Sequence, residues 1–340
     1  MKAAFELETT AYNMYFSTTS GFRIDNIEFT PIEAFWKEYR DRSDKLLEKP
    51  SGKKLLEDNF WRRQEQHPTA TVKIGLTCCE EDLEQEVERT KEILHNYSIL
   101  LSFAHGHHVH FMGLDCYKGS GGSRKCFSTR GLGGRMGKPG IEPSNITGRG
   151  VEPFLIHTAS LFKDSDFVER TQIRRAMIWY NEVQCLTEGM PFEAAFPSLW
   201  TTLEILAGAH ALETGNELLK DAGRLDEIKR SFGATLRKLN VSQSASWLAK
   251  LTGYTSVMNR VRKLAKKYNL KQYEPELKRF YELRNVIVHG HSFKMGNDEV
   301  DCLLRLHRFA EKIILKILNF YDRKDMVHSA ITRDDLRATR

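Results

Sequence analysis

Glu282-Leu283-Arg284-Asn285-Val286-Ile287-Val288-His289-Gly290 has the pattern of a helix that carries a cation in its apolar face. Counting about 100° per residue from Leu277, one face of this helix would hold the apolar side chains of Phe280, Tyr281, Ile287 and Val288. Arg284 falls in the middle of that face. Because burying a guanidinium is costly unless an anion or several acceptors meet it, the stretch predicts a partner for Arg284.

Two polar neighbours, Asn285 and His289, accompany this arginine. Histidine titrates near neutral pH and can transfer protons, and the planar fork of arginine donors can bind a phosphate. The asparagine can hold either group in place. Together, Arg284, Asn285 and His289 suit attack at a phosphodiester.

The spacing of Arg284 and His289 imposes a condition on this chemistry. Residues five apart on an ideal helix point about 140° away from each other, so the two side chains cannot converge on one helix face. Either Gly290 ends the helix and His289 lies on an unwound last turn, or a second copy completes a composite site across a two-fold axis. We favour the second arrangement.

The same residues match a known motif. Arg284-Asn285-x-x-x-His289 fits the pattern Arg-x(4 to 6)-His, often with a polar residue after the arginine, that ribonucleases of the HEPN superfamily carry. Further segments occur in the order of an Apea-like HEPN domain: Trp179-Tyr180-Asn181-Glu182, Ser198 to Leu206, Tyr281 to Asn285, and His289-Gly290. The C-terminal half of the chain therefore resembles an Apea-like HEPN domain.

This resemblance implies an all-α helical bundle and an activity. Two HEPN domains would pair as a homodimer and bring both motifs into one cleft, which would cleave RNA without a metal or other cofactor and leave a 2′,3′-cyclic phosphate. His289 would act as general base or acid, Arg284 would stabilise charge on the phosphoryl oxygens, and Asn285 would orient one of them. The resemblance also implies a toxin-like or anti-phage role. The alternative is a non-catalytic HEPN module that binds nucleic acid or a protein partner, with Arg284 satisfied inside the bundle.

Length and composition are those of a soluble protein with two domains. The 340 residues suffice for two cores, and 41% of them are hydrophobic and 28% charged. No apolar run has the length of a membrane helix and the start of the chain turns acidic at once, so we expect a cytoplasmic protein without membrane contact. Six cysteines without a Cys-x-x-Cys pair predict reduced thiols. The net charge of +6 permits an anionic partner such as RNA.

The N-terminal part of the chain has the pattern of an α+β domain. Short alternating runs between Phe5 and Phe29 are typical of strands in hairpins, and a helical segment follows around Phe35. Alternation from Val72 to Cys78, helical spacing from Leu83 to Leu101 and a strand near residues 107–117 predict a β-α-β passage.

The pattern divides the chain into three parts. We expect an α+β N-terminal domain over residues 1–153, an all-α, HEPN-like helical bundle over 154–322 and a polar tail over 323–340. Apolar stripes at helical spacing mark the bundle: Ile173, Ala176, Met177, Tyr180 and Val183; Phe192, Phe196, Leu199, Leu203 and Leu206; Val300, Leu303, Leu304, Ala310 and Ile314. Glu204 lies beside the second stripe and is a candidate partner for Arg284, with an exposed surface glutamate as the alternative.

Two basic segments are candidates for contact with RNA phosphates. The first is a helical segment with Arg260, Arg262, Lys263, Lys266 and Lys267. The second is a loop expected over residues 118–150, in which ten glycines and seven Lys or Arg residues stand against a single acidic residue. Arg130 and Arg135 are its candidate contacts. A solvated helix face and a disordered linker are the respective alternatives.

The stretch His105-Gly106-His107-His108-Val109-His110 places His108 and His110 on one face of a strand. Two such imidazoles with a third ligand from elsewhere could hold zinc. Because no carboxylate or cysteine pair completes a known spacing, we expect strand-end histidines and no metal site.

Overall fold

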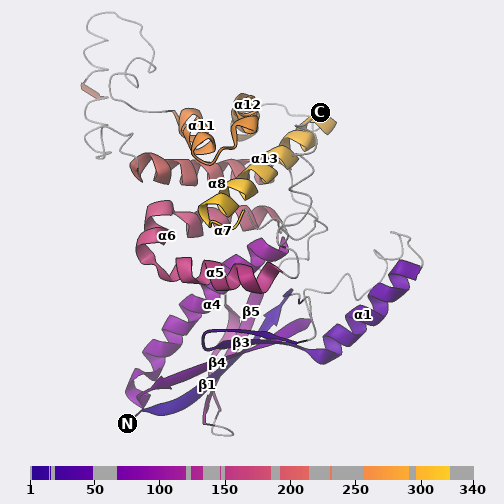
Figure 1. Ribbon diagram of the computed structural model, residues 1–340, viewed down its shortest axis with the longest axis vertical. Helices are drawn as coiled ribbons and strands as arrows, with labels where there is room; N and C mark the ends of the chain where they lie inside the picture. Colours follow the sequence, from indigo (N-terminus) through magenta and orange to yellow (C-terminus); the bar gives the residue numbers. More distant parts are fainter. Residues whose placement is uncertain are drawn as a thin grey trace, which may run out of the picture. The chain divides into compact units, whose positions relative to one another are not determined.

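The computed structural model of the chain describes residues 2–14, 16, 20–48, 67–119, 124–132, 146, 150–184, 192–213, 230–231, 256–290 and 296–321. These residues form an antiparallel sheet with helices in the N-terminal half, and helices in the C-terminal half (Figure 1). The expected mixture of α and β structure, with a helical C-terminal half, is therefore confirmed.

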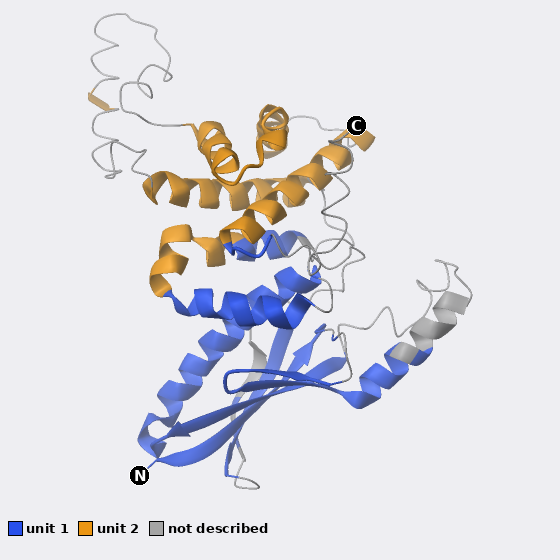
Figure 2. Ribbon diagram, viewed as in Figure 1, with its two compact units in different colours: residues 1–164, 177–191, 318–340 blue, residues 165–176, 192–317 orange. Residues whose placement is uncertain are grey.

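The chain forms two compact units, and neither is one continuous stretch (Figure 2). Unit 1 comprises residues 1–164, 177–191 and 318–340, whereas unit 2 comprises residues 165–176 and 192–317. The division differs from the expected boundaries, because residues 177–184 and 318–321 of the expected helical domain belong to unit 1. The extent of independently folding domains stays a prediction.

The sheet of unit 1 has the strand order β2-β3-β4-β1-β5-β6. Its strands are β1 (Ala3–Tyr12), β2 (Phe22–Ile24), β3 (Ile27–Pro31), β4 (Pro68–Cys78), β5 (His110–Lys118) and β6 (Arg124–Leu132). Since β1 pairs antiparallel with both β4 and β5, these two strands run parallel to each other. The crossover between them contains helix α4 (Leu83–His105). The expected β-α-β passage is thus confirmed, with β1 inserted between its strands.

One part of the expected loop over residues 118–150 is regular structure. Residues 124–132 form β6, which pairs with β5 in an antiparallel hairpin. A backbone ladder can form whatever the side chains are, which is why a glycine-rich, basic composition did not reveal this strand. Most of the remaining loop lies outside the described residues.

The alternation of β1 gives the sheet two different faces. Phe5, Leu7, Thr9 and Ala11 are buried, and the residues between them are partly exposed. Helix α4 packs on the sheet and buries a long apolar stripe that includes Val87, Leu94, Leu101 and Phe103. Helix α1 (Glu33–Glu48) is anchored near its start, where the buried Trp36 donates from Nε1 to the carbonyl oxygen of Thr69 at 3.1 Å.

Three chain segments complete the core of unit 1. Phe103 of α4 packs against Phe154 of α5 (Val151–Lys163), with ring centroids 5.9 Å apart. It also packs against Tyr180, in the part of α7 (Ile173–Gln184) that belongs to unit 1, at 5.3 Å. Phe320, near the end of the described chain, meets Phe154 edge-on at 5.1 Å. Segments far apart in the sequence therefore share one apolar core.

Unit 2 is built around helix α8 (Phe192–Glu213). This helix packs against α6 (Ser165–Thr171), α11 (Val257–Lys267), α12 (Leu277–Val288) and α13 (Asn297–Ile317). The predicted stripe of α8 is confirmed, because Phe196, Leu199, Leu203 and Leu206 are buried. The turn η4 (Lys271–Tyr273) leads from α11 toward α12, the helix that carries the motif.

Candidate functional site

Helix α12 ends directly before the motif histidine. His289 is the C-cap residue, with φ −88° and ψ 7°, and Gly290 follows with a left-handed φ of 67°. The backbone N–H of His289 donates to the carbonyl oxygen of Asn285 at 3.0 Å, and that of Gly290 donates to the oxygen of Ile287 at 3.2 Å. Gly290 therefore ends the helix in the way a glycine after a C-cap does, and His289 lies on the last turn. A composite site with a second copy remains a prediction.

Arg284 is half-buried and is held by its neighbour. Its Nη1 donates to Oδ1 of Asn285 at 3.2 Å. An amide oxygen carries no net charge, so this hydrogen bond orients the guanidinium and leaves its positive charge unneutralised. Among the described residues, no carboxylate lies within ion-pair distance of Arg284. The remaining N–H groups of the guanidinium can serve an anion.

The expected pair of Glu204 and Arg284 is not formed in the described part of the chain. Instead, Oε1 of Glu204 accepts a hydrogen bond from Nε1 of Trp200 at 2.6 Å. The indole of Trp200 is fully buried in α8 and its N–H needs an acceptor there. Glu204 supports the packing of α8 through this bond.

The predicted apolar face of α12 needs a correction. Leu277 and Phe280 are buried, but Tyr281 is 37% exposed and Val288 is 48% exposed. Arg284 therefore lies at the edge of the buried face and not in its middle. The reason is that α12 packs on α8 with its first turns, and its second half reaches the surface. In this second half, Tyr281, Val288 and His289 are exposed, whereas Arg284 and Asn285 are half-buried.

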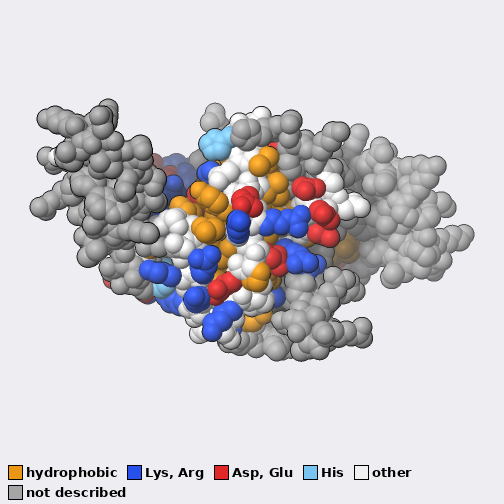
Figure 3. Space-filling view, turned by 90° about the horizontal axis from the view of Figure 1, so that it is seen from above, with side chains coloured by type: hydrophobic (Ala, Val, Ile, Leu, Met, Phe, Trp, Pro, Cys, Tyr) orange, Lys and Arg blue, Asp and Glu red, His pale blue; other side chains and the backbone are white. Residues whose placement is uncertain are grey.

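The basic residues of α11 are largely paired with their own neighbours. Lys267 contacts Glu213 at 3.0 Å, and this hydrogen bond lowers the pKa of the Glu213 carboxyl. Nη1 of Arg262 donates to Oδ1 of Asn259 at 2.7 Å, and Lys266 lies 4.0 Å from Glu274. The two other candidates on this helix are Arg260, which is half-buried, and Lys263, which is exposed. Figure 3 shows Lys and Arg side chains interspersed with acidic ones around apolar patches when the molecule is seen from above.

The basic candidates of the glycine-rich segment cannot be placed in the same way. Arg130 belongs to β6, but its side chain lies outside the described residues, as does the whole of Arg135.

The histidine cluster lies in the core of unit 1. His105, His107, His108 and His110 are all buried. Nε2 of His107 lies 2.8 Å from the carbonyl oxygen of Asn13, and the rings of His105 and His107 stack at 5.6 Å. Burial lowers the pKa of His105 to about 3 and the pKa values of His107 and His110 to about 4. Desolvation thus keeps His105, His107 and His110 neutral near neutral pH. No group of three metal-ligating side chains occurs among the described residues.

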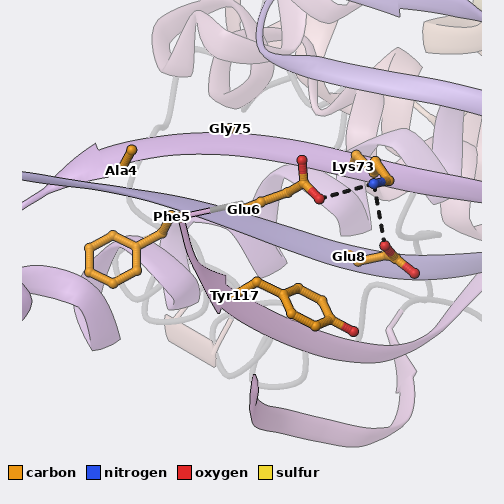
Figure 4. Close-up of a pocket in the computed structure, with 8 residues that line it drawn as sticks. Ala4, Phe5, Glu6, Glu8, Lys73, Gly75 and Tyr117 are labelled. Atoms are coloured by element: carbon orange, nitrogen blue, oxygen red, sulfur yellow. Dashed lines mark hydrogen bonds and ion pairs between the residues drawn. The ribbon is translucent and has the colours of Figure 1, made fainter. Parts of the chain in front are cut away.

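A shallow groove of about 560 Å³ lies on the exposed face of the sheet (Figure 4). Its lining was not singled out from the sequence: Ala4, Phe5, Glu6, Glu8, Lys73, Gly75, Tyr117 and Gly119. Lys73 reaches both Glu6, at 3.0 Å, and Glu8, at 3.7 Å, and the hydrogen bond with Glu6 raises the pKa of Lys73. The alternation of Glu6 and Glu8 with apolar residues in β1 was the only signal for this cluster. Lys73 offsets one of the two carboxylate charges, and these partly exposed ion pairs give the groove no evident chemistry.

Comparison of the chain with protein-family models, curated proteins and solved structures gives no match. Within the described residues, no helix combines the length and the hydropathy that a membrane span requires. The cysteines whose side chains are described, Cys78, Cys79, Cys116 and Cys302, are free thiols. Among the described residues, the α12 motif of Arg284, Asn285 and His289 is the most specific candidate for a functional site.

Proposed function

We propose that this protein is a metal-independent RNA endonuclease of the HEPN type, with a composite active site in a homodimer. The observation that carries the proposal is the state of Arg284, a half-buried cation whose described polar partner is the neutral Oδ1 of Asn285. A cation that is oriented but not neutralised suits an anionic ligand. His289 is exposed at the end of the same helix and can exchange protons.

The reaction would be an internal transfer at phosphorus. His289, as general base, would take the proton of a ribose 2′-hydroxyl, whose oxygen would then form a bond to the adjacent phosphorus. The bond from phosphorus to the 5′-oxygen of the next nucleotide would break, and a protonated imidazole would supply the proton to that oxygen. The products would be a 2′,3′-cyclic phosphate and a 5′-hydroxyl. Arg284 would stabilise the charge that grows on the phosphoryl oxygens, and Asn285 would hold its guanidinium.

The two-fold arrangement would supply the second imidazole. Because each copy brings one Arg284 and one His289, a homodimer would offer one histidine as base and the other as acid. Exposed α11 lysines such as Lys263 would contact the flanking phosphates. A cytoplasmic toxin-like or anti-phage role would fit an enzyme of this kind.

The test is cleavage of RNA by the purified protein in the presence of EDTA. Wild type is compared with Arg284→Ala and His289→Ala, and folding and dimerisation are checked for each variant by circular dichroism and sedimentation. The proposal expects cleavage with cyclic phosphate ends in wild type and a loss of at least about 100-fold in each variant. Cleavage that EDTA abolishes, or cleavage that survives in both variants, contradicts it.

A second candidate function is a non-catalytic HEPN module that binds nucleic acid or a protein partner. It is favoured by the hydrogen bonds at the end of α12, because Asn285 and His289 also take part in closing the helix. This candidate expects no RNA cleavage in any form. It expects Arg284→Ala, which removes a side-chain hydrogen bond, to unfold at lower urea concentration than wild type, whereas His289→Ala keeps its backbone hydrogen bond and its stability.

A further inference from the structure

Tyr281 is an exposed aromatic ring beside the motif. The side chain is 37% exposed, although α12 packs on α8 at this point. One side of the ring meets the indole of Trp200, with centroids 5.9 Å apart and the planes tilted by 55°. An aromatic ring that packs against one neighbouring ring and is still partly exposed can accept a second planar group.

The support behind Tyr281 is fixed. Trp200 is fully buried, and its Nε1 donates to Glu204 at 2.6 Å, which prevents the indole from turning. Tyr281 is therefore held in a defined orientation, and a group that packs on it loses little free energy to ordering the protein. Glu204 thus fixes the indole that supports Tyr281, which it would not do if it paired with Arg284.

Helix geometry places this ring next to the motif. Tyr281 and Arg284 are three residues apart and Tyr281 and Asn285 are four apart, so they are neighbours on the surface of α12. At a rise of about 1.5 Å per residue, the Cα atom of Tyr281 precedes that of Arg284 by about 4.5 Å along the axis. This step is on the scale that separates the base of a nucleotide from its adjacent phosphate.

We propose that Tyr281 is a platform on which an unpaired nucleobase of the RNA substrate stacks while Arg284 binds the adjacent phosphate. The inference rests on the proposed function of the same site and narrows its substrate class. A base in a duplex has both faces covered by its neighbours, so a stacking platform selects single-stranded or looped RNA. Tyr281 thus determines specificity and takes no part in proton transfer.

The experiment measures binding and cleavage separately. Binding is measured by fluorescence anisotropy in the full-length His289→Ala background, which cannot cleave under the proposed mechanism. The probes are a labelled oligouridylate of twelve nucleotides and the same strand paired with oligoadenylate. Two substitutions, Tyr281→Leu and Tyr281→Phe, are compared. A matched control is Trp179→Leu, which removes a similarly exposed aromatic ring (40%) from α7.

Stacking predicts that Tyr281→Leu weakens binding of the single strand by about tenfold or more. Tyr281→Phe, which keeps the ring, stays within about twofold of the parent, as does Trp179→Leu. Binding of the duplex is weaker than that of the single strand in the parent and does not change in Tyr281→Leu. The same order of the Tyr281 variants appears in the cleavage of single-stranded RNA when they are made with His289 intact.

The outcomes separate this inference from the proposed function. Binding of the single strand that depends on Tyr281, without any cleavage by wild type, would support the stacking platform and contradict the nuclease activity. If Tyr281→Leu cleaves RNA as fast as wild type, the stacking platform is contradicted and the nuclease activity is supported. Equal losses on both probes, or a change of sedimentation in Tyr281→Leu that shows a lost dimer contact, also overturn the platform.

Discussion

At the scale of single residues, the neighbours of a charged side chain determine how strongly it can bind a ligand of opposite charge. Arg284 and Arg262 are both half-buried and each donates to the Oδ1 of an asparagine. The hydrogen bond of Arg284 is partly buried and that of Arg262 is exposed, so water screens the charge of Arg284 less. Lys267, by contrast, already contacts Glu213, so little of its charge is left for a ligand. The same residue types thus differ in what they can bind.

Replacement of Asn285 by aspartate tests the need for an unneutralised guanidinium. Asn285→Asp turns the 3.2 Å hydrogen bond into an ion pair and holds Arg284 in place with its charge offset. RNA cleavage should fall by about 10- to 100-fold, whereas the free energy of unfolding should change by less than about 1 kcal/mol. Initial cleavage rates and urea unfolding measure the two effects.

Asn259→Asp is the matched control, because Oδ1 of Asn259 accepts from Arg262 on the exposed side of α11. Asn259→Asp lowers the net charge by one unit, as Asn285→Asp does, but it should lower cleavage by less than about fivefold. Equal losses in the two variants would mean that net charge, and not the state of Arg284, matters.

His110 provides a test of acid stability. Its ring stacks on Tyr12 at 5.0 Å, neither ring nitrogen has a hydrogen-bond partner among the described residues, and burial lowers its pKa to about 4. The folded state thus holds the imidazole neutral while the unfolded chain protonates it near its ordinary pKa of 6.5. Stability is therefore complete above about pH 6.5 and is lost as the pH falls from there toward 4.

His110→Phe keeps the stacked ring and removes the titration. Between pH 7 and pH 5 the variant should lose about 1–2 kcal/mol less unfolding free energy than wild type. Urea unfolding at several pH values measures this difference. If the unfolding free energy of the variant has the same pH dependence as that of wild type, folding does not lower the pKa of His110.

At the scale of elements, the end of α12 determines where His289 lies. Gly290 adopts φ 67°, and a Cβ built on it would meet no atom of the described residues within 4 Å. Any cost of a side chain there therefore comes from the backbone conformation and not from a clash.

Gly290→Ala should lower the unfolding free energy by about 1–2 kcal/mol. It should also lower RNA cleavage, because relief of the strain would shift the backbone next to His289. Gly75→Ala is the control, since that position in β4 is equally open and lacks a left-handed φ. The unfolding free energy of Gly75→Ala should not fall below that of wild type. A Gly290→Ala protein as stable and active as wild type would exclude a role for the left-handed turn.

At the scale of the whole molecule, the end of the chain belongs to the unit that holds the start. Phe320 is fully buried against Phe154, and the carbonyl oxygen of Leu318 lies 2.8 Å from Nε2 of His157. Unit 1 is thus closed by residues that follow the last helix of unit 2. The core of unit 1 therefore depends on Phe320.

Phe320→Ala should lower the stability of unit 1 by about 3–5 kcal/mol, because a large buried ring is replaced by a cavity. Hydrogen exchange should report the loss in α4 and α5, whose rings contact this core. Val300→Ala, at an exposed apolar position of α13, should change stability by less than about 0.5 kcal/mol. Faster exchange confined to unit 2 in Phe320→Ala would contradict the assignment of residue 320 to unit 1.

The sequence alone determined the local elements and the identity of the motif. Alternation revealed β4, and helical spacing revealed α7, α8 and α12, because side-chain periodicity follows directly from backbone geometry. The end of α12 at Gly290 was one of two alternatives that the residues left open. Only the tertiary structure decided that α12 exposes Tyr281, that Glu204 serves Trp200, and that residues 318–321 close the core around Phe103. These facts depend on contacts between segments far apart in the chain, which no local periodicity encodes.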